Sequence, residues 1–413
     1  YEIGVRLVGS EMCIRDSVNI ETGMSGDDSV TDTDALKVLN TEIMAGTGPD
    51  VLLLDGISED TYIEKGMLED LSGVLKDTDI LSNIKDAYTK EDGSIYTMPV
   101  KFGIPMIEGN KDIIAGITDL TTEADAAESQ KDSYGKLQFF SDFSIAPSYL
   151  IQGTIDNSIP AWMNEDGTLN ENAVKEYLEQ VNRIWQTQKN AIEETKKAYQ
   201  MGDDWADSDH SGYMDISGSV TSLLAKVDTV AAGGLLSPEG LVSLDSARKV
   251  DPDLDYKLLN GQSENCFYPR SAVGVSAKAS EKEAAEKFVK FLFEEESQRA
   301  SNTEGLAVNS KVYEDMAYWK MGKSSGDTIG SIGTSYDTGD GNIKQFVMDE
   351  IIPEDEAIQN IMDLGKTLTV PAKSNQIIRS AVTESGEKYL NGETGLDDAV
   401  KEIMQEVNLY LSE

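Results

Sequence analysis

The segment AGTGPDVLLLDG, residues 45–56, decides the fold of this chain. Its apolar run at residues 51–54 lies between turn residues, which is typical of a central parallel strand covered on both faces. Before it, Leu36, Leu39 and Ile43 recur at helical spacing, and the glycines and proline of GTGP end that helix. After it, Ser58 can cap another helix. Helix, buried strand and helix in succession predict an open α/β layer.

Composition narrows the classes of partner. The chain has 413 residues, of which 39% are hydrophobic, and this is enough for two lobes with separate cores. Its formal net charge is −40, because 75 acidic residues outnumber 35 basic ones. Such a chain offers no basic face to nucleic-acid phosphates and is repelled by anionic lipid. Neutral or cationic small ligands remain, and no apolar run is long enough to predict a membrane-spanning helix.

The opening segment YEIGVRLVGSEMCIRDS, residues 1–17, has no periodicity that leads into the rest of the chain. We predict that it is a non-native leader, and that the natural signal region and a first β-strand are missing. Cys13 lies in this leader, and Cys266 is then predicted to be a lone buried thiol. The sequence therefore predicts neither a disulfide nor a zinc site.

Two longer segments indicate how the chain is organised. Residues 93–107 are extended and contain Pro99 and Pro105, which suits an edge strand or a crossing between lobes. A long amphipathic helix begins at Asn170. Its predicted buried face consists of Val174, Tyr177, Leu178, Val181, Ile184, Trp185 and Gln188.

The C-terminal part of the chain has further signals. A buried strand is predicted at residues 227–236, and Ser280 and Glu283 have the spacing of a capping box. The apolar face of the capped helix is predicted to be Ala284, Phe288, Phe291 and Leu292. Residues 321–341 are rich in Gly, Ser, Thr and Asp and predict a surface loop. The stripe of the last helix consists of Leu396, Val400, Ile403, Val407 and Leu411.

Reactive groups are scarce. His210 is the only histidine, which excludes an HExxH zinc site and leaves any catalytic triad dependent on one residue in an acidic loop. Asp207 and Asp209 copy the start of a calcium loop, but Gly218 stands where a bidentate glutamate is needed. Carboxylate pairs for glycoside hydrolysis are always available in so acidic a chain. We predict no catalytic residue, no metal and no cofactor.

Aromatic residues beside turn signals are the more informative group, because flat rings stack on sugar rings while polar groups bond the hydroxyls. The alternative is that they fill the cores and interfaces of the lobes. These aromatic residues are Phe102, Phe143, Trp162, Trp205, Phe267, Tyr268, Trp319 and Tyr336. Trp185, on the apolar stripe of a helix, is assigned to the core.

Three segments resemble the extracellular solute-binding proteins of family 1, the maltose-binding-protein-like components of ABC importers. They are LKVLNTEIMAGTGPDVLLLDGISEDTYIEKGMLEDLSGVL, SIYTMPVKFGIPMI, and AVGVSAKASEKEAAEKFVKFLFEEESQ followed by GLAVNSKVYE. The resemblance implies a two-lobed α/β fold in which mixed sheets flanked by helices are joined by hinge crossings. The implied first lobe is 18–101 plus 268–310, and the implied second lobe is 102–267 plus 311–413.

The resemblance also implies a ligand site between the lobes, because ligands of open α/β sheets bind beyond the carboxyl ends of strands. Two roles are open for Asp55, a ligand contact or a cap of the next helix, and two for Arg270, a ligand contact or a partner of hinge carboxylates. The predicted ligand-binding residues are Asp55, Gly56, Ser58, Phe102, Phe143, Trp205, Tyr268, Arg270 and Tyr336.

The implied function is capture of a neutral sugar or oligosaccharide, without catalysis, and its delivery to permease subunits. We expect a monomer outside the cell, anchored as a lipoprotein in its full-length form. Two alternatives from other classes stay open, a carboxylate-based glycoside hydrolase and a peptide-binding or adhesive surface protein.

Overall fold

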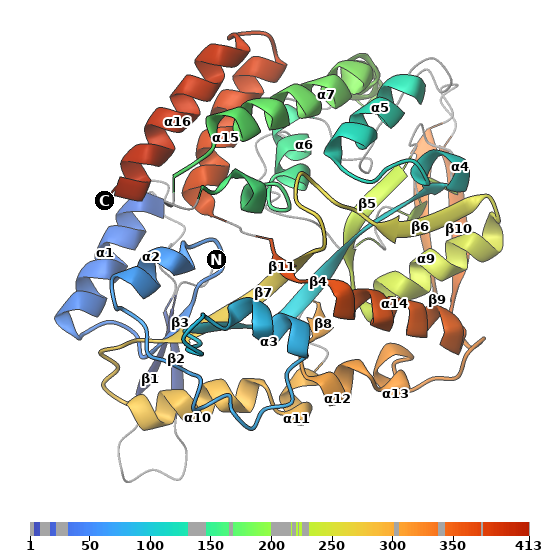
Figure 1. The fold of residues 1–413 in the computed structure, drawn as a ribbon. Coiled ribbons are helices and arrows are strands. Elements are labelled where there is room, and N and C mark those ends of the chain that lie inside the picture. The colour runs from blue at the N-terminus through green and yellow to red at the C-terminus, as the bar shows by residue number, and fades with distance from the viewer. Residues whose placement is uncertain are drawn as a thin grey trace.

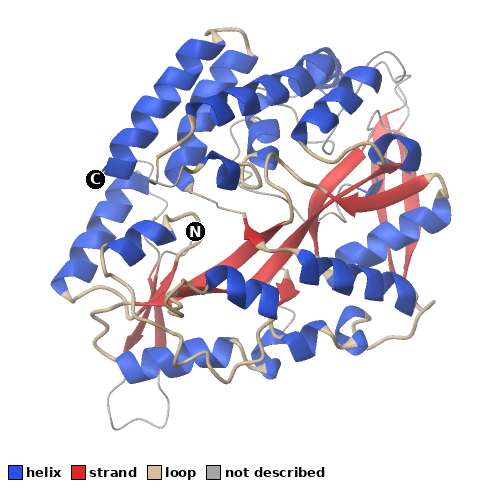
Figure 2. Ribbon diagram, in the orientation of Figure 1, coloured by secondary structure: helices blue, strands red, loops and turns tan. Residues whose placement is uncertain are grey.

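The computed structural model describes most of the chain. The described residues are 4–8, 17–21, 32–130, 146–164, 168–199, 216, 220–221, 223–224, 231–300, 305–337, 343–372 and 375–412. The strands form a diagonal band with helices on both sides of it, as Figure 2 shows.

Two long antiparallel strands run side by side through the centre of the molecule (Figure 1). They are β4 (Thr97–Asn110) and β7 (Cys266–Val275). The main path of the sheet has the order β2-β1-β3-β7-β4-β5. Its other strands are β1 (Gly4–Val8), β2 (Ser17–Glu21), β3 (Val51–Leu53) and β5 (Ala231–Leu236). Off this path, β6 (Leu254–Leu258) and β8 (Leu306–Ala307) pair with β4, and β11 (Val370–Pro371) pairs with β7.

Pro99 and Pro105 lie inside β4, which is a crossing strand and not an edge strand. Its first half pairs with β7 as far as Gly103, and its second half pairs with β5 from Ile104 onward. Pro105 has no N–H to donate, but its carbonyl oxygen accepts a hydrogen bond from the backbone N of Leu259 at 2.9 Å. Of the two predicted alternatives, the crossing is confirmed.

The strand predicted at residues 51–54 is confirmed as β3, but its predicted parallel neighbours are wrong. β3 pairs antiparallel with β7, where Val51 lies opposite Val275, and antiparallel with β1, where Val51 lies opposite Val5. Strand β7 is antiparallel to both of its neighbours, β3 and β4, so β3 and β4 point the same way but are separated by β7. β1 consists of residues of the predicted leader.

Helices α1 (Asp32–Ala45) and α2 (Glu59–Glu64) enclose β3 as predicted. Gly46 follows α1 with a φ of +72°, a left-handed conformation that glycine adopts without steric cost. The Oγ of Ser58 caps α2 by accepting a hydrogen bond from the backbone N of Thr61 at 3.4 Å. We call the elements around this core the first lobe. Its buried side chains include Leu39, Ile43, Leu52, Leu54, Tyr62, Met67 and Leu68.

A second group of helices packs around its own core, and we call it the second lobe. It contains α4 (Lys111–Ile114), α5 (Leu120–Gln130), α6 (Pro147–Thr154), η1 (Ile159–Trp162), α7 (Glu171–Tyr199), α15 (Gln376–Leu390) and α16 (Leu396–Ser412). The predicted buried face of α7 is confirmed, and Trp185 lies in the core. Cys266 is a buried free thiol, and burial raises its pKa to about 12.

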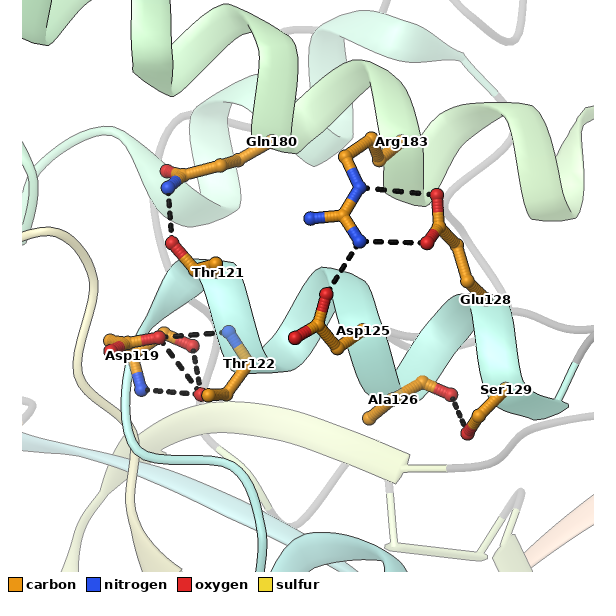
Figure 3. Close-up of polar contacts among 9 residues, drawn as sticks. All are labelled: Asp119, Thr121, Thr122, Asp125, Ala126, Glu128, Ser129, Gln180 and Arg183. Atoms are coloured by element: carbon orange, nitrogen blue, oxygen red, sulfur yellow. Dashed lines mark hydrogen bonds and ion pairs between the residues drawn. The ribbon is translucent and has the colours of Figure 1, made fainter.

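Polar contacts join α5 to α7 at the outer side of the second lobe (Figure 3). The guanidinium of Arg183 donates to both oxygens of Glu128, at 3.1 and 2.7 Å, and to Asp125 at 2.5 Å. The side-chain amide of Gln180 donates to the hydroxyl of Thr121. These bonds fix the packing of α5 against α7.

The remaining helices lie along the sheet and below it in Figure 1. They are α3 (Ser82–Tyr88), α9 (Pro238–Val250), α10 (Lys282–Leu292), α11 (Glu295–Gln298), α12 (Ser310–Tyr313), α13 (Met316–Trp319) and α14 (Asp355–Thr367). A separate antiparallel ribbon consists of β9 (Thr328–Asp337) and β10 (Ile343–Ile351). The predicted surface loop at residues 321–341 is therefore wrong over β9, because backbone pairing does not require apolar side chains.

The predicted capping box at Ser280 is also wrong. Helix α10 begins at Lys282, and its N-cap Glu281 makes no side-chain capping bond. The carboxylate of Asp50 accepts instead from the backbone N atoms of Ser280 and Glu281, at 2.6 and 3.1 Å. The buried face of α10 is shifted as well, because Ala285 and Val289 are buried while Phe291 is 46% exposed.

A further cluster of buried side chains spans the sheet and the helices below it. At its centre Phe102 packs edge-on against Phe267 and lies 5.6 Å from Tyr313 between ring centroids. The cluster includes Leu71 and Ile361, which belong to different predicted lobes. The residue boundaries of the two lobes thus stay a prediction.

Candidate functional site

The loop after β3 places Asp55 where the first lobe meets the crossing strand β7. Asp55 is exposed, yet its Oδ1 accepts a hydrogen bond from the backbone N of Ala272 at 3.4 Å, and the N–H of Ser271 also donates to the carboxylate. Desolvation raises the pKa of Asp55, while these two hydrogen bonds and the charge of Arg270 act against it. Asp55 therefore contacts solvent while protein atoms surround it closely. It does not cap α2, since Ser58 does.

Ser271 has a strained backbone at this point. Its φ of +54° lies in the left-handed region, which costs a residue with a Cβ about 1–2 kcal/mol. Strain of this kind persists only where surrounding contacts hold it, and it is common at functional sites. The bond from the Ser271 N–H to Asp55 is one such contact. The strained residue directly follows the half-buried Arg270.

A buried ion pair lies on the second-lobe side. Asp156, which follows α6, accepts a hydrogen bond from Arg379 of α15, and their side chains are only 6% and 7% exposed. Desolvation raises the pKa of Asp156, whereas Arg379 and Arg270 both act in the opposite direction. Arg270 acts on the carboxyls of both Asp55 and Asp156. We call these two acids from opposite lobes and the two arginines the polar cluster, and both predicted roles of Arg270 stay predictions.

Gly56 and Ser58 connect the lobes directly. The carbonyl oxygen of Gly56, whose φ is +78°, accepts a hydrogen bond from the backbone N of Gln376 at 2.8 Å. The side chain of Ser58 forms a hydrogen bond with Tyr410 of α16, which also bonds Asn375. Both predicted residues therefore lie at the interface of the two lobes.

Acidic groups beside this interface already have partners within the first lobe. Glu59 accepts a hydrogen bond from the hydroxyl of Thr97 at 2.5 Å, and Asp60 pairs with Lys90 at 3.2 Å. Burial raises the pKa of Tyr88 well above its usual value, and the nearby carboxylates raise it further. Tyr88 is consequently a neutral phenol among carboxylates.

Three of the predicted aromatic contacts, Phe102, Tyr268 and Tyr336, lie within the described residues. Phe102 is fully buried in the core and has no surface for a ligand, and Tyr268 is only 6% exposed. Tyr336 belongs to β9, and the ribbon β9–β10 lies beside α9, across Figure 1 from α2 and α15. Phe143 and Trp205 lie outside the described residues, as does His210. Trp162, Phe267 and Trp319 are buried and fill cores.

Sequence reasoning missed the second-lobe half of the interface, namely Asp156, Asn375, Arg379 and Tyr410. No local signal marks Asp156, because its partner Arg379 is 223 residues away in the chain. Asn375 could have been recognised from the sequence, because Asn and Asp favour N-cap positions of helices. In the structure its Oδ1 accepts hydrogen bonds from the backbone N atoms of Ile377 and Ile378, both at 3.1 Å.

Other features of the described residues do not add a reactive centre. Within the described ranges, His, Cys, Asp and Glu side chains form no group of three or more that could hold a metal ion. A hollow of about 310 Å³ opens between α7 and α16, but none of the predicted site residues lines it. None of the described helices combines the length and apolar character that crossing a membrane requires.

Comparison with known proteins identifies the family. A family model described as bacterial extracellular solute-binding protein matches residues 16–299, more than half of the chain. The chain belongs to the bacterial extracellular solute-binding protein family. This is a family of binding proteins rather than of catalysts. No curated protein matches the sequence.

Solved structures agree with this solute-binding protein fold. A family 1 extracellular solute-binding protein from Alicyclobacillus acidocaldarius is 16% identical with a TM-score of 0.50, and the match covers 92% of this chain and 88% of that one. Maltose-bound MalE3 of T. maritima has the same identity and TM-score, with 92% and 89% covered. A binding protein of B. animalis subsp. lactis Bl-04, in complex with beta-1,6-galactobiose, is 14% identical with a TM-score of 0.51, covering 94% and 90%. At these identities the likeness shows the two-lobed fold alone.

Proposed function

We propose that this solute-binding protein captures a neutral sugar or oligosaccharide between its lobes and delivers it to the permease of an ABC importer. The observation that carries the proposal is the charge-balanced cluster of Asp55, Asp156, Arg270 and Arg379 at the meeting of the lobes. A polyhydroxy ligand can exchange hydrogen bonds with such groups and leave no net charge behind. A charged ligand would add an uncompensated charge to a partly desolvated place.

Binding then proceeds by hinge closure about the crossing strands β4 and β7. Ligand contacts to both lobes favour the closed state, because a ligand shifts the equilibrium toward the state it binds better. On the first lobe we assign these contacts to Asp55, Gly56, Ser58 and Arg270. Phe143 and Trp205 stay predicted stacking residues, whereas Phe102, Tyr268 and Tyr336 leave the set for the reasons given above. No bond of the ligand is made or broken.

Location and partners follow from the same proposal. The binding protein acts outside the cell as a monomer, held to the membrane by a lipid anchor. Permease subunits recognise its closed state. These partners define the transport role, since a binding protein alone moves nothing across a membrane.

The test is isothermal titration with a panel of neutral sugars that includes maltose and beta-1,6-galactobiose, followed by product analysis. Saturable binding with every sugar recovered intact is the expected result. Release of shorter sugars would instead establish the glycoside hydrolase alternative. Binding of peptides with no response to any carbohydrate would favour the peptide-binding alternative.

A matched pair of variants connects binding to the cluster. Asp55→Asn removes a charge and a hydrogen-bond acceptor at the lobe interface, and we expect about 10- to 100-fold weaker binding of whichever panel sugar binds. Asp397→Asn removes the same charge from the exposed surface of α16, and its affinity should equal that of the wild type. Equal affinity for both variants would take Asp55 out of the site.

A further inference from the structure

We propose that Tyr410, in the last turn of α16, is a latch that ties the second lobe to the first and thereby sets the closed fraction and the ligand affinity. The effect of the latch on ligand affinity rests on the proposed function, whereas the latch itself rests on contacts within the chain. The side chain of Tyr410 forms hydrogen bonds with Asn375 and with Ser58.

The two partners of Tyr410 are fixed by their own helices. The Oγ of Ser58 accepts from the backbone N and the hydroxyl of Thr61, at 3.4 and 2.9 Å, at the start of α2 in the first lobe. The Oδ1 of Asn375 accepts from two backbone N atoms at the start of α15 in the second lobe, both at 3.1 Å. Since this oxygen is engaged, the side-chain NH2 of Asn375 is the group that can donate to the phenol. Tyr410 therefore bonds one N-cap in each lobe.

Helix α16 belongs to the second lobe along its length and extends past that lobe only at its end. Val400, Ile403 and Val407 are buried in the second-lobe core, whereas Leu409 is 64% exposed. The C-terminal end of α16, marked C in Figure 1, meets α2 of the first lobe through the contact of Tyr410 with Ser58. Tyr62 of α2 lies close enough to Tyr410 for the charge of Tyr410 to add to the rise in the pKa of Tyr62 that burial causes. Anchoring at one end and contact at the other is the geometry of a latch.

The latch acts together with one backbone bond. The N–H of Gln376 donates to the carbonyl of Gly56 at 2.8 Å, directly beside the Tyr410 contacts. Separation of α2 from α15 breaks this bond and the bridge through Tyr410 together. Because the affinity falls in proportion to the population of the competent state, loss of one hydrogen bond should weaken binding about 2- to 10-fold.

The test measures the distance between the lobes without any ligand. Spin labels are placed at Glu64→Cys in α2 and Glu393→Cys after α15, both exposed, in a Cys13→Ser background that keeps the buried Cys266. Tyr410→Phe keeps the ring and removes the hydroxyl, and we expect its longer-distance population to rise about 2- to 10-fold. Tyr389→Phe is the control, because Asn182 donates to the Tyr389 hydroxyl at 3.2 Å within the second lobe. The control should give the wild-type distribution.

Ser58→Gly guards against a folding artefact, since glycine is an acceptable N-cap that lacks the hydroxyl bonded by Tyr410. It should show the same shift as Tyr410→Phe. Identical distance distributions in the wild type, Tyr410→Phe and Ser58→Gly would overturn the latch. Because no ligand takes part, this outcome is separate from a failure of every sugar to bind, which would overturn the proposed function alone.

Discussion

Asp156 and Arg379 form the most deeply buried ion pair at the meeting of the described parts of the lobes. Burial of two charges carries a large desolvation cost, which their attraction offsets only while both partners are present. The charge of Arg270 gives Asp156 a second favourable interaction. The pair is for this reason sensitive to the removal of one partner.

Asp156→Asn should destabilise the protein by about 3 kcal/mol, because it leaves the guanidinium of Arg379 buried without its countercharge. Urea denaturation at neutral pH measures the change in the free energy of unfolding. Asp397→Asn breaks the exposed pair with Lys175 and should change that free energy by less than about 1 kcal/mol. Equal effects of the two substitutions would mean that burial does not determine the strength of the Asp156 pair.

Individual residues were predictable where a local pattern determines them. Asp55 and Ser58 follow directly from the end of a buried strand and the start of a helix, and both lie at the lobe interface. Phe102 was placed wrongly, because an aromatic residue beside turn signals has the same local pattern in a core as at a surface. Arg379 and Tyr410 act through tertiary contacts that no short-range spacing encodes.

For whole helices, too, the buried face was predictable where the local pattern determines it and not where it allows alternatives. The spacing of apolar residues along α7 predicted its buried face correctly, because this helix is long and many apolar residues indicate the same face. Helix α10 is short, and its apolar side chains allow more than one face, so the buried one was shifted. Its predicted cap failed because Asp50, from another part of the chain, accepts from the backbone N of Ser280, which the side chain of Glu283 would bond in a capping box.

Helix α5 carries a buried carboxyl group toward the second-lobe core. Glu123 is 1% exposed, and its Oε1 has no hydrogen-bond partner among the described residues. Desolvation raises the pKa of Glu123 to about 8, with a smaller contribution from the nearby Asp119. The native state thus keeps a proton that the unfolded chain, with its ordinary carboxyl pKa, releases at lower pH.

The stability of the second lobe should therefore fall as pH rises. The contribution of Glu123 is fully present below the unfolded-state pKa of about 4.3 and is lost as pH rises through about 8. Glu123→Gln removes this titration, so its stability relative to the wild type should increase by on the order of 4 kcal/mol between pH 5 and pH 9. Urea denaturation at both pH values gives the comparison. Glu179→Gln, on the exposed face of α7, should follow the wild type, and parallel profiles for Glu123→Gln would refute the assignment.

At the scale of the whole molecule, acidic charge exceeds what internal pairing can neutralise. Even if every Lys and Arg formed an ion pair, 40 carboxylates would have no basic partner, since the formal net charge is −40. Exposed pairs such as Lys90–Asp60 each contribute at most about 1 kcal/mol. Mutual repulsion of the excess acids acts over the whole surface and opposes the compact state.

Salt should accordingly stabilise this protein. The screening length falls from about 30 Å at 0.01 M to about 3 Å at 1 M ionic strength, which weakens the repulsion more than it weakens the few short ion pairs. We expect the melting temperature to rise with NaCl and equally with KCl, as followed by circular dichroism. The affinity for a neutral sugar should stay constant over the same range, because no charge is transferred into the site. A melting temperature that falls with salt would mean that ion pairs, and not the excess of acids, dominate the electrostatics of the fold.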